Sequence, residues 1–308
     1  MRRDFANEVS SIQKIKRADL VEKDFILHQI LLDLSKNEFF TENFAFKGGT
    51  CLIKCYLGYF RFSEDIDFTW KQQEVFKGKS QKEIRRYLSR TIDKLGVILT
   101  DIAAKRGLDF KCEKHNKTYV ELGGGNKTCT FKIWYLSEIL DHRSFVKVQI
   151  TFVEWLYSDP QKIELKSLLD KKHEKINELF PEHEEYLQRI VFDAYPVTEI
   201  LCEKVRAILT REGVKARDFL DVYQICQMYG IKLQDIHDCV VGKTQFMLSR
   251  YQKYRNSFAK KKNIVLSEDT FTWGEERGLL LQNFDKIGFY RFLRELREFL
   301  RKIITELS

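Results

Sequence analysis

Residues 47 to 68 read Lys-Gly-Gly-Thr-Cys-Leu-Ile-Lys-Cys-Tyr-Leu-Gly-Tyr-Phe-Arg-Phe-Ser-Glu-Asp-Ile-Asp-Phe. Two glycines, Gly48 and Gly49, allow a backbone to approach a phosphate group closely, and Thr50 follows where a helix would begin. Free N–H groups at such a turn, together with the threonine hydroxyl, favour an anion. The first half of this stretch therefore predicts part of a nucleotide site.

The second half of the same stretch indicates a metal site on a short strand. Asp65 and Asp67 are two residues apart, so both carboxylates leave one face of the strand while Ile66 and Phe68 point into the core. Paired carboxylates suit a divalent metal, which triphosphate transfer chemistry requires. The alternative for the glycine pair is an ordinary tight turn before a helix, and the alternative for the aspartates is the polar face of an edge strand.

The composition allows two lobes and favours a polyanionic partner. The chain has 308 residues, of which 44% are hydrophobic, and a formal net charge of +8. Residues 250 to 308 hold 13 Lys and Arg against 8 Asp and Glu, so much of the positive charge lies near the C-terminus. This asymmetry predicts a basic surface there, which would suit a nucleic acid.

The cysteine and histidine patterns exclude some classes of protein. Seven cysteines without a Cys-x-x-Cys pair indicate free thiols, and six scattered histidines do not have the spacing of a zinc site. The N-terminus has no apolar signal-like segment, and no run approaches the ~18 apolar residues that a membrane span needs. We expect a cytoplasmic protein without a membrane partner.

The periodicity of apolar residues changes along the chain. It predicts helices over residues 8–36 and 80–106, a hairpin of residues 108–121 and 127–136, and a third strand over residues 145–154. Beyond about residue 160 the strand signals fade, and helical spacing continues to a last helix over residues 290–307. We therefore expect two domains: residues 1–158 with mixed α and β structure, and residues 159–308 with helices.

The helical half contains a second group of charged residues. Lys204 and Arg211 share one helical stripe, and Asp218 and Asp221 share another. Either cation could reach a phosphate, or the four residues could form a buried ion-pair network. Residues 260–262, three lysines, form a basic loop that either touches phosphate or is solvated.

Four segments, taken in order, carry a family resemblance. They are Phe46-Lys-Gly-Gly-Thr-x-Leu-x-Lys54, Arg61-Phe-Ser-Glu-Asp-Ile-Asp-Phe68, Glu203-Lys204 and Arg217-Asp218-x-x-Asp221. This order closely resembles the AbiEii/AbiGii toxin family, a branch of the DNA polymerase β-like nucleotidyltransferases that includes tRNA-modifying toxins. The likeness begins near Glu22-Lys-Asp-Phe25 and ends near Tyr223. It implies an α+β fold, with a mixed or antiparallel sheet in the transferase core and a helical C-terminal lobe.

The resemblance implies a role for each matching residue of the first lobe. Gly49 and Thr50 would hold the nucleotide phosphates, and Asp65 and Asp67 would bind magnesium in a two-metal site. Ser63 would support the phosphates or orient the aspartates. Arg61 remains open, because it could also cap a turn or pair with the neighbouring glutamate.

In the second lobe, Lys204 matches a family lysine expected at the triphosphate, and Asp218 matches an essential family acid. Asp221 follows in the same motif, and these residues would form the second wall of a cleft. Polymerase β-like transferases commonly have a third carboxylate on a later strand, about where this chain has Gln149. A neutral amide is no useful base, and Glu154 has the opposite strand parity, so Asp218 or no residue would take the proton.

The resemblance implies a magnesium-dependent nucleotidyltransferase that moves a nucleoside monophosphate from an NTP to an acceptor hydroxyl. The expected acceptor is RNA, the 3′ end of tRNA, and the expected setting is a toxin of a toxin–antitoxin or phage-defence system with a cognate antitoxin. Gln149 supports an alternative, a non-catalytic nucleotide- or partner-binding protein. A phosphotransferase acting on a protein or small molecule is a second alternative.

Overall fold

We describe a computed structural model of the chain, covering residues 2–169, 175–264, 271 and 274–308. The chain forms two compact units. Unit 1 comprises Met1–Glu154 and Pro160–Ala194, and unit 2 comprises Trp155–Asp159 and Tyr195–Ser308. Each unit is described by itself.

Unit 1 is built on one mixed sheet, so the predicted α+β class is confirmed. In spatial order its strands are β3 (Val120–Gly123), β4 (Thr128–Leu136), β5 (Arg143–Thr151), β2 (Asp65–Trp70), β1 (Phe44–Lys47), β7 (Ile190–Ala194) and β6 (Gln161–Leu165). Strand β2 is parallel to β5 and antiparallel to β1, and β1 is parallel to β7. This order places β2, with its two aspartates, in the interior of the sheet.

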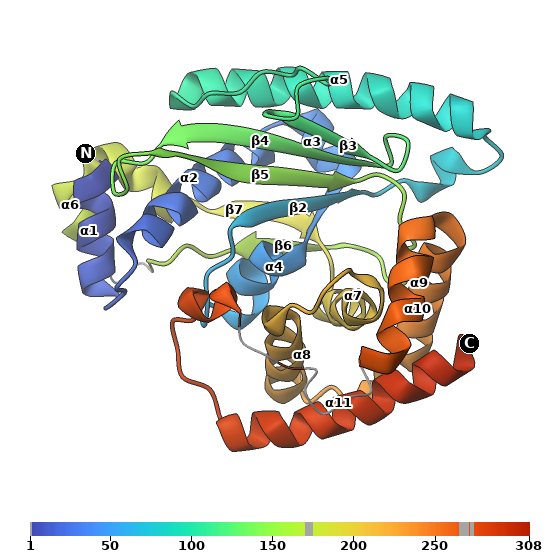
Figure 1. Ribbon diagram of the computed structural model, residues 1–308. Helices are drawn as coiled ribbons and strands as arrows, with labels where there is room; N and C mark the ends of the chain where they lie inside the picture. Colours follow the sequence, from blue (N-terminus) through green and yellow to red (C-terminus); the bar gives the residue numbers. More distant parts are fainter. Residues whose placement is uncertain (1, 170–174, 265–270, 272–273) are drawn as a thin grey trace. The chain divides into compact units, whose positions relative to one another are not determined.

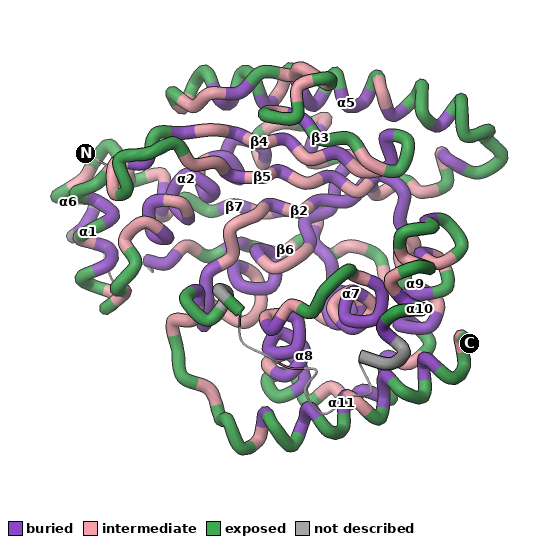
Figure 2. Tube along the Cα trace, in the orientation of Figure 1, coloured by how far each residue is buried: buried purple, intermediate pink, exposed green. Residues whose placement is uncertain are grey.

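Helices flank this sheet. They are α1 (Arg2–Ile12), α2 (Ala18–Ser35), α3 (Glu38–Asn43), α4 (Gly48–Cys51), α5 (Gln81–Arg106) and α6 (Lys175–Leu179). A π-helix, Leu52–Leu57, continues α4, and 3₁₀ helices span Gln73–Phe76 and Pro181–Leu187. The long helix α5 runs beside β3 and β4, with one side exposed along its length (Figures 1 and 2).

Two helix predictions in unit 1 have different outcomes. The helix predicted over residues 80–106 is confirmed as α5, with Ser80 in a capping box and Gly107 in the left-handed conformation after its end. The helical segment predicted over residues 8–36 is instead two helices, α1 and α2. The chain turns between them at Lys14, whose φ of 54° does not belong to a helix.

The strands near the end of unit 1 correct the sequence interpretation. Strand signals were expected to end near residue 160, but β6 and β7 lie beyond it and extend the sheet through β1. The predicted boundary between residues 158 and 159 thus differs from the observed division, which assigns residues 160–194 to unit 1. The physical reason is the parallel pairing of β7 with β1, a contact between segments far apart in the chain.

The elements of unit 2 within the described residues are helices. They are α7 (Val197–Thr210), α8 (Ala216–Tyr229), α9 (His237–Arg250), α10 (Gln252–Ile264) and α11 (Lys286–Glu306), with 3₁₀ helices at Leu233–Ile236 and Glu275–Leu279. The predicted last helix is confirmed as α11, and its apolar stripe is buried (Figure 2). The basic loop predicted at residues 260–262 is wrong, because these residues belong to α10 and Lys261 is buried.

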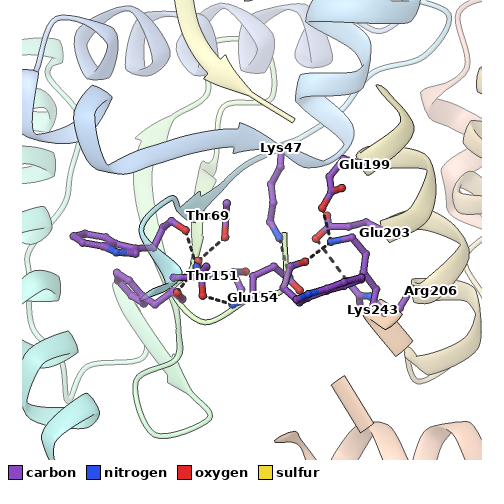
Figure 3. A network of polar contacts seen from close by, with 12 residues as sticks. Lys47, Thr69, Thr151, Glu154, Glu199, Glu203, Arg206 and Lys243 are labelled. Atoms are coloured by element: carbon purple, nitrogen blue, oxygen red, sulfur yellow. Dashed lines mark hydrogen bonds and ion pairs between the residues drawn. The ribbon is translucent and has the colours of Figure 1, made fainter. Parts of the chain in front are cut away.

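Segment Trp155–Asp159 is fixed inside unit 2 by a fully buried ion pair. Lys243 Nζ lies 2.6 Å from Glu199 Oε1, both side chains are 0% exposed, and Figure 3 shows the pair. Lys243 also donates to the carbonyl oxygen of Trp155 at 2.7 Å. The Glu199 carboxylate accepts hydrogen bonds from the backbone N–H groups of Tyr157 and Ser158, at 3.1 Å each.

Among the described residues, no helix combines the length and the apolar character needed to cross a membrane.

Candidate functional site

The glycine pair follows β1 directly and forms a turn against three polar side chains. Gly48 has a φ of 78°, and a Cβ at this position would lie 2.2 Å from Asp67 Oδ2. A Cβ on Gly49 would lie 2.9 Å from Ser63 Oγ and 3.2 Å from an Arg61 guanidinium nitrogen. Only glycine allows this close approach, which gathers a carboxylate, a hydroxyl and a guanidinium around the turn.

Thr50 has a structural partner. Its side chain is 1% exposed, and its hydroxyl donates a short hydrogen bond to the main-chain carbonyl oxygen of Asp65. The sequence interpretation assigned this hydroxyl to a phosphate. In the structure it fastens the turn to β2 at Asp65, the residue that carries one of the two carboxylates.

The two aspartates alternate with core residues, as their spacing predicts. Ile66 and Phe68 are 0% exposed, whereas Asp65 and Asp67 are half-buried on the opposite face of β2. Alternate strand residues share a face, so the two carboxylates lie side by side. Their repulsion makes this face a favourable place for a cation.

Gln149 lies directly beside Asp67. Strands β2 and β5 pair in parallel, with Asp65 opposite Lys147 and Asp67 opposite Gln149. The Gln149 side-chain amide donates to Asp67 Oδ1 at 3.1 Å. The polar face predicted for this strand is confirmed, and the amide now has a defined contact, since it holds one oxygen of a candidate metal ligand.

Glu154 has a different partner. It lies after β5, which ends at Thr151, so its strand parity does not decide where it points. Its carboxylate is 3.5 Å from the Lys47 ammonium, and both side chains are nearly buried (Figure 3). In the antiparallel register of β1 and β2, Lys47 lies opposite Asp67. Glu154 therefore balances a lysine at the edge of the site.

The residues present fit a magnesium ion of the kind that also binds phosphate. Mg²⁺ prefers oxygen ligands and is commonly held by one or two carboxylates together with substrate phosphates and water. Asp65 and Asp67 provide these carboxylates. Within the part of the chain that the structure describes, no cluster of three or more His, Cys, Asp or Glu side chains could hold a metal alone.

Sequence reasoning left the role of Arg61 open. Arg61 is 2% exposed and lies against Gly49, and one guanidinium nitrogen donates to the carbonyl oxygen of Phe62 at 2.7 Å. Its suggested partner Glu64 instead pairs with Lys23 at 2.8 Å. The available signal was an arginine placed between two phenylalanines, a position where a buried cation needs a specific reason.

In unit 2 the four predicted residues come together as an ion-pair network. Lys204 Nζ lies 2.9 Å from Asp218 and 2.8 Å from Asp221, and Arg211 lies 2.6 Å from Asp218. Both aspartates are buried, at 2% and 0% exposure. The network joins α7 to α8 and fixes the Lys204 ammonium between two carboxylates.

The electrostatics of this network bear on proton transfer. Burial alone would raise the pKa of Asp218, but Lys204 and Arg211 beside it lower that pKa well below the usual range of an aspartate. A general base works best with a pKa near the working pH. Asp218 is therefore suited to holding Lys204 in place and poorly suited to accepting a proton.

A comparison with protein families defines the class of protein as a nucleotidyltransferase. The family model described as "Nucleotidyl transferase AbiEii toxin, Type IV TA system" matches residues 29–286. This match spans most of the chain. The chain belongs to the AbiEii nucleotidyltransferase toxin family of type IV toxin–antitoxin systems.

Two solved structures are also similar. JHP933 from Helicobacter pylori is 15% identical, with 94% of each chain covered and a TM-score of 0.43. A candidate nucleotidyltransferase from H. pylori is 14% identical, with 94% of this chain and 97% of that chain covered and a TM-score of 0.43. No curated protein matches the chain. The family assignment therefore rests on the family model.

Proposed function

We propose that this family member transfers a nucleoside monophosphate from an NTP to a hydroxyl group of RNA, with the 3′ end of tRNA as acceptor, in a magnesium-dependent reaction. The observation that carries the proposal is the meeting of Gly48 and Gly49 with Asp67, Ser63 and Arg61. A close backbone turn and a guanidinium suit phosphate groups, and the adjacent carboxylates suit the metal that accompanies them.

The proposed reaction is a single displacement at phosphorus. The acceptor oxygen forms a bond to the α-phosphorus, while the bond from that phosphorus to the oxygen bridging the α- and β-phosphates breaks. Pyrophosphate leaves with the electron pair. The hydroxyl proton passes to water, because Gln149 is neutral and the pKa of Asp218 is held too low for a base.

The residues of unit 1 bind and orient the nucleotide. Arg61 and Ser63 would contact phosphate oxygens at the glycine turn, and Gln149 would keep the Asp67 carboxylate in one orientation. Magnesium, held by Asp65 and Asp67, would supply charge neutralisation on the phosphates and a lower pKa for the acceptor hydroxyl. In unit 2, the family resemblance assigns Lys204 to the charge of the triphosphate.

The proposal is tested by replacing the two carboxylates. Purified protein is incubated with magnesium, each α-labelled NTP in turn, and either total tRNA or a protein extract. We expect label in tRNA with the unaltered protein, and a loss of at least about two orders of magnitude in Asp65→Asn and Asp67→Asn. The midpoint temperature of thermal unfolding should be unchanged or slightly higher in both variants, because each substitution removes repulsion between like charges.

Asp101→Asn is the matched control, since Asp101 is exposed on α5. It should retain full activity. Full incorporation by both carboxylate variants would refute the site assignment. Label in protein would identify a different acceptor, and NTP binding without pyrophosphate release would indicate a non-catalytic binding protein.

A further inference from the structure

Unit 1 contains a buried polar cluster that lies outside the carboxylate site. Its members are Asp24 on α2, Lys54 in the π-helix, Tyr59 just after it, and Tyr186 in the 3₁₀ helix Pro181–Leu187. Asp24 is 3% exposed, and Lys54 and Tyr186 are each 1% exposed. Charged side chains are seldom buried to this extent without a specific role.

The cluster converges on a single carboxylate. Lys54 Nζ lies 3.0 Å from Asp24 Oδ1 and 3.1 Å from Oδ2. The Tyr186 hydroxyl donates to Asp24 Oδ2 at 2.6 Å, and the Tyr59 hydroxyl donates to the same oxygen at 3.0 Å. Lys54, Tyr59 and Tyr186 thus hold Asp24. The contacts with Lys54 and Tyr186 are buried, and the contact with Tyr59 is partly buried.

The position of Lys54 connects this cluster to the glycine turn. The turn begins α4 at Gly48, and the π-helix Leu52–Leu57 follows α4 without a break. Lys54 is fixed twice, by its ammonium in the cluster and by its carbonyl oxygen, which accepts from the Lys166 N–H at 2.9 Å. π-Helical segments are uncommon and frequently occur at functional sites.

Stability alone is a weak explanation for such a cluster. A buried ion pair can often be replaced by apolar residues of similar volume without loss of stability, because desolvation offsets the attraction between the charges. What directed hydrogen bonds add is a unique geometry. Here the geometry that they determine is the path of the chain immediately after the turn.

We propose that Asp24 and Lys54 are positioning residues for nucleotide binding. Their ion pair, completed by Tyr59 and Tyr186, anchors the continuous α4 and π-helix segment to α2. It thereby keeps Gly48 and Gly49 in a fixed position beside β2. This inference rests on the proposed function, because the turn must bind phosphate for the anchoring to affect affinity. Lys54 ends the first of the segments that carry the family resemblance, and Asp24 lies where the likeness begins. The resemblance gave neither residue a role.

The experiment measures binding of a non-reactive α,β-methylene NTP in the presence of magnesium, by calorimetry on the full chain. We expect Lys54→Met to weaken this binding about ten-fold, since a small displacement of positioned groups has large effects. Tyr186→Phe removes little volume, and it removes the hydrogen bond to Asp24 together with the one that the hydroxyl accepts from the Leu168 N–H at 3.3 Å. It should fold and weaken binding about three-fold. If Lys54→Met does not fold, the affinity of Tyr186→Phe tests the positioning role.

The matched control is Arg106→Met. Arg106 forms another nearly buried ion pair with α2, at 2.5 Å from Asp33, and contacts the 3₁₀ helix through Glu185 at 2.6 Å. It therefore shares the anchoring elements of the cluster without touching the segment after the turn. We expect a comparable loss of thermal stability with unchanged nucleotide affinity.

The outcomes separate the inference from the proposed function. Absence of NTP binding by the unaltered protein would overturn the proposed function. Normal affinity in Lys54→Met or, where that variant is unfolded, in Tyr186→Phe would overturn the positioning role alone. Equal weakening in Arg106→Met would also overturn it, because affinity would then follow general stability.

Discussion

Gly48 is the residue at which two physical requirements coincide. Its φ of 78° lies in the left-handed region, and a Cβ there would approach Asp67 Oδ2 to 2.2 Å. Either requirement would favour glycine, but only the second connects the turn with a candidate metal ligand. Replacement by alanine therefore tests a contact as well as a backbone conformation.

We predict that Gly48→Ala loses activity beyond what its lost stability explains. The left-handed backbone should cost about 1–2 kcal/mol, and the displaced Asp67 should reduce nucleotide incorporation at least about ten-fold. Gly107→Ala is the control, since it has a φ of 63° and nothing within 4 Å of its Cβ. Similar stability losses with activity retained only in Gly107→Ala would support the contact; equal activity in both would contradict it.

For single residues, the sequence predicts those features that depend on neighbours in the chain. The alternation of Asp65 and Asp67 with core residues follows from strand periodicity, and the structure has it. The bond from Gln149 to Asp67 and the approach of Arg61 to Gly49 depend on which strands and loops meet. Such long-range pairings leave no periodic signal in a single sequence.

Among the elements of unit 2, the contact between α10 and the end of α7 contains a buried lysine. Lys261 Nζ donates to the carbonyl oxygen of Ile208 at 2.7 Å, and so satisfies a group that the end of a helix leaves open. Burial and the nearby Arg211 together lower the pKa of Lys261 to about 8, against an opposing effect of Asp218. The charged form is therefore disfavoured by folding.

This shift predicts how stability depends on pH. Between pH 8 and the unfolded pKa of 10.5, the unfolded chain keeps a proton that the folded chain has lost, so the Lys261 contribution to the free energy of unfolding rises with pH. Below pH 8 both states are charged and the penalty is constant. We predict that the unfolding free energy of the unaltered protein minus that of Lys261→Met increases from pH 8 to 10.

Denaturant unfolding at several pH values measures this difference. Other titrating groups are common to both proteins and largely cancel in the subtraction. A difference that stays flat or falls across this range would contradict the assigned pKa direction. The lost hydrogen bond to Ile208 adds only a constant offset.

The elements themselves were predictable where their signals are local and strong. Helix α5 has a long apolar stripe, a serine cap and a terminal glycine, all readable from neighbouring residues. Strands β6 and β7 have five residues each and were missed. In β6 only Leu165 is buried, so it shows little alternation of apolar and polar residues.

At the scale of the whole molecule, the chain passes between its two units three times, after residues 154, 159 and 194. The short excursion of Trp155–Asp159 is tied into unit 2 by Lys243 and Glu199. A composition-based boundary cannot detect such an excursion, since the residues on both sides of it return to one sheet. The sequence therefore predicted two domains while missing how the first is completed.

This topology makes a prediction about fragments of the chain. A fragment of residues 1–158 would leave one edge of β1 without its partner β7, although all four residues of β1 are buried. It would also lose Tyr186 from the cluster at Asp24. An unpaired apolar edge favours aggregation, so we expect this fragment to be aggregated or to lack a cooperative transition.

Residues 1–194 retain every strand of the sheet and should unfold cooperatively. Circular dichroism would follow the unfolding of both fragments, and size-exclusion chromatography would show whether they aggregate. Cooperative unfolding of a monomeric 1–158 fragment would show that β6 and β7 are dispensable to the sheet.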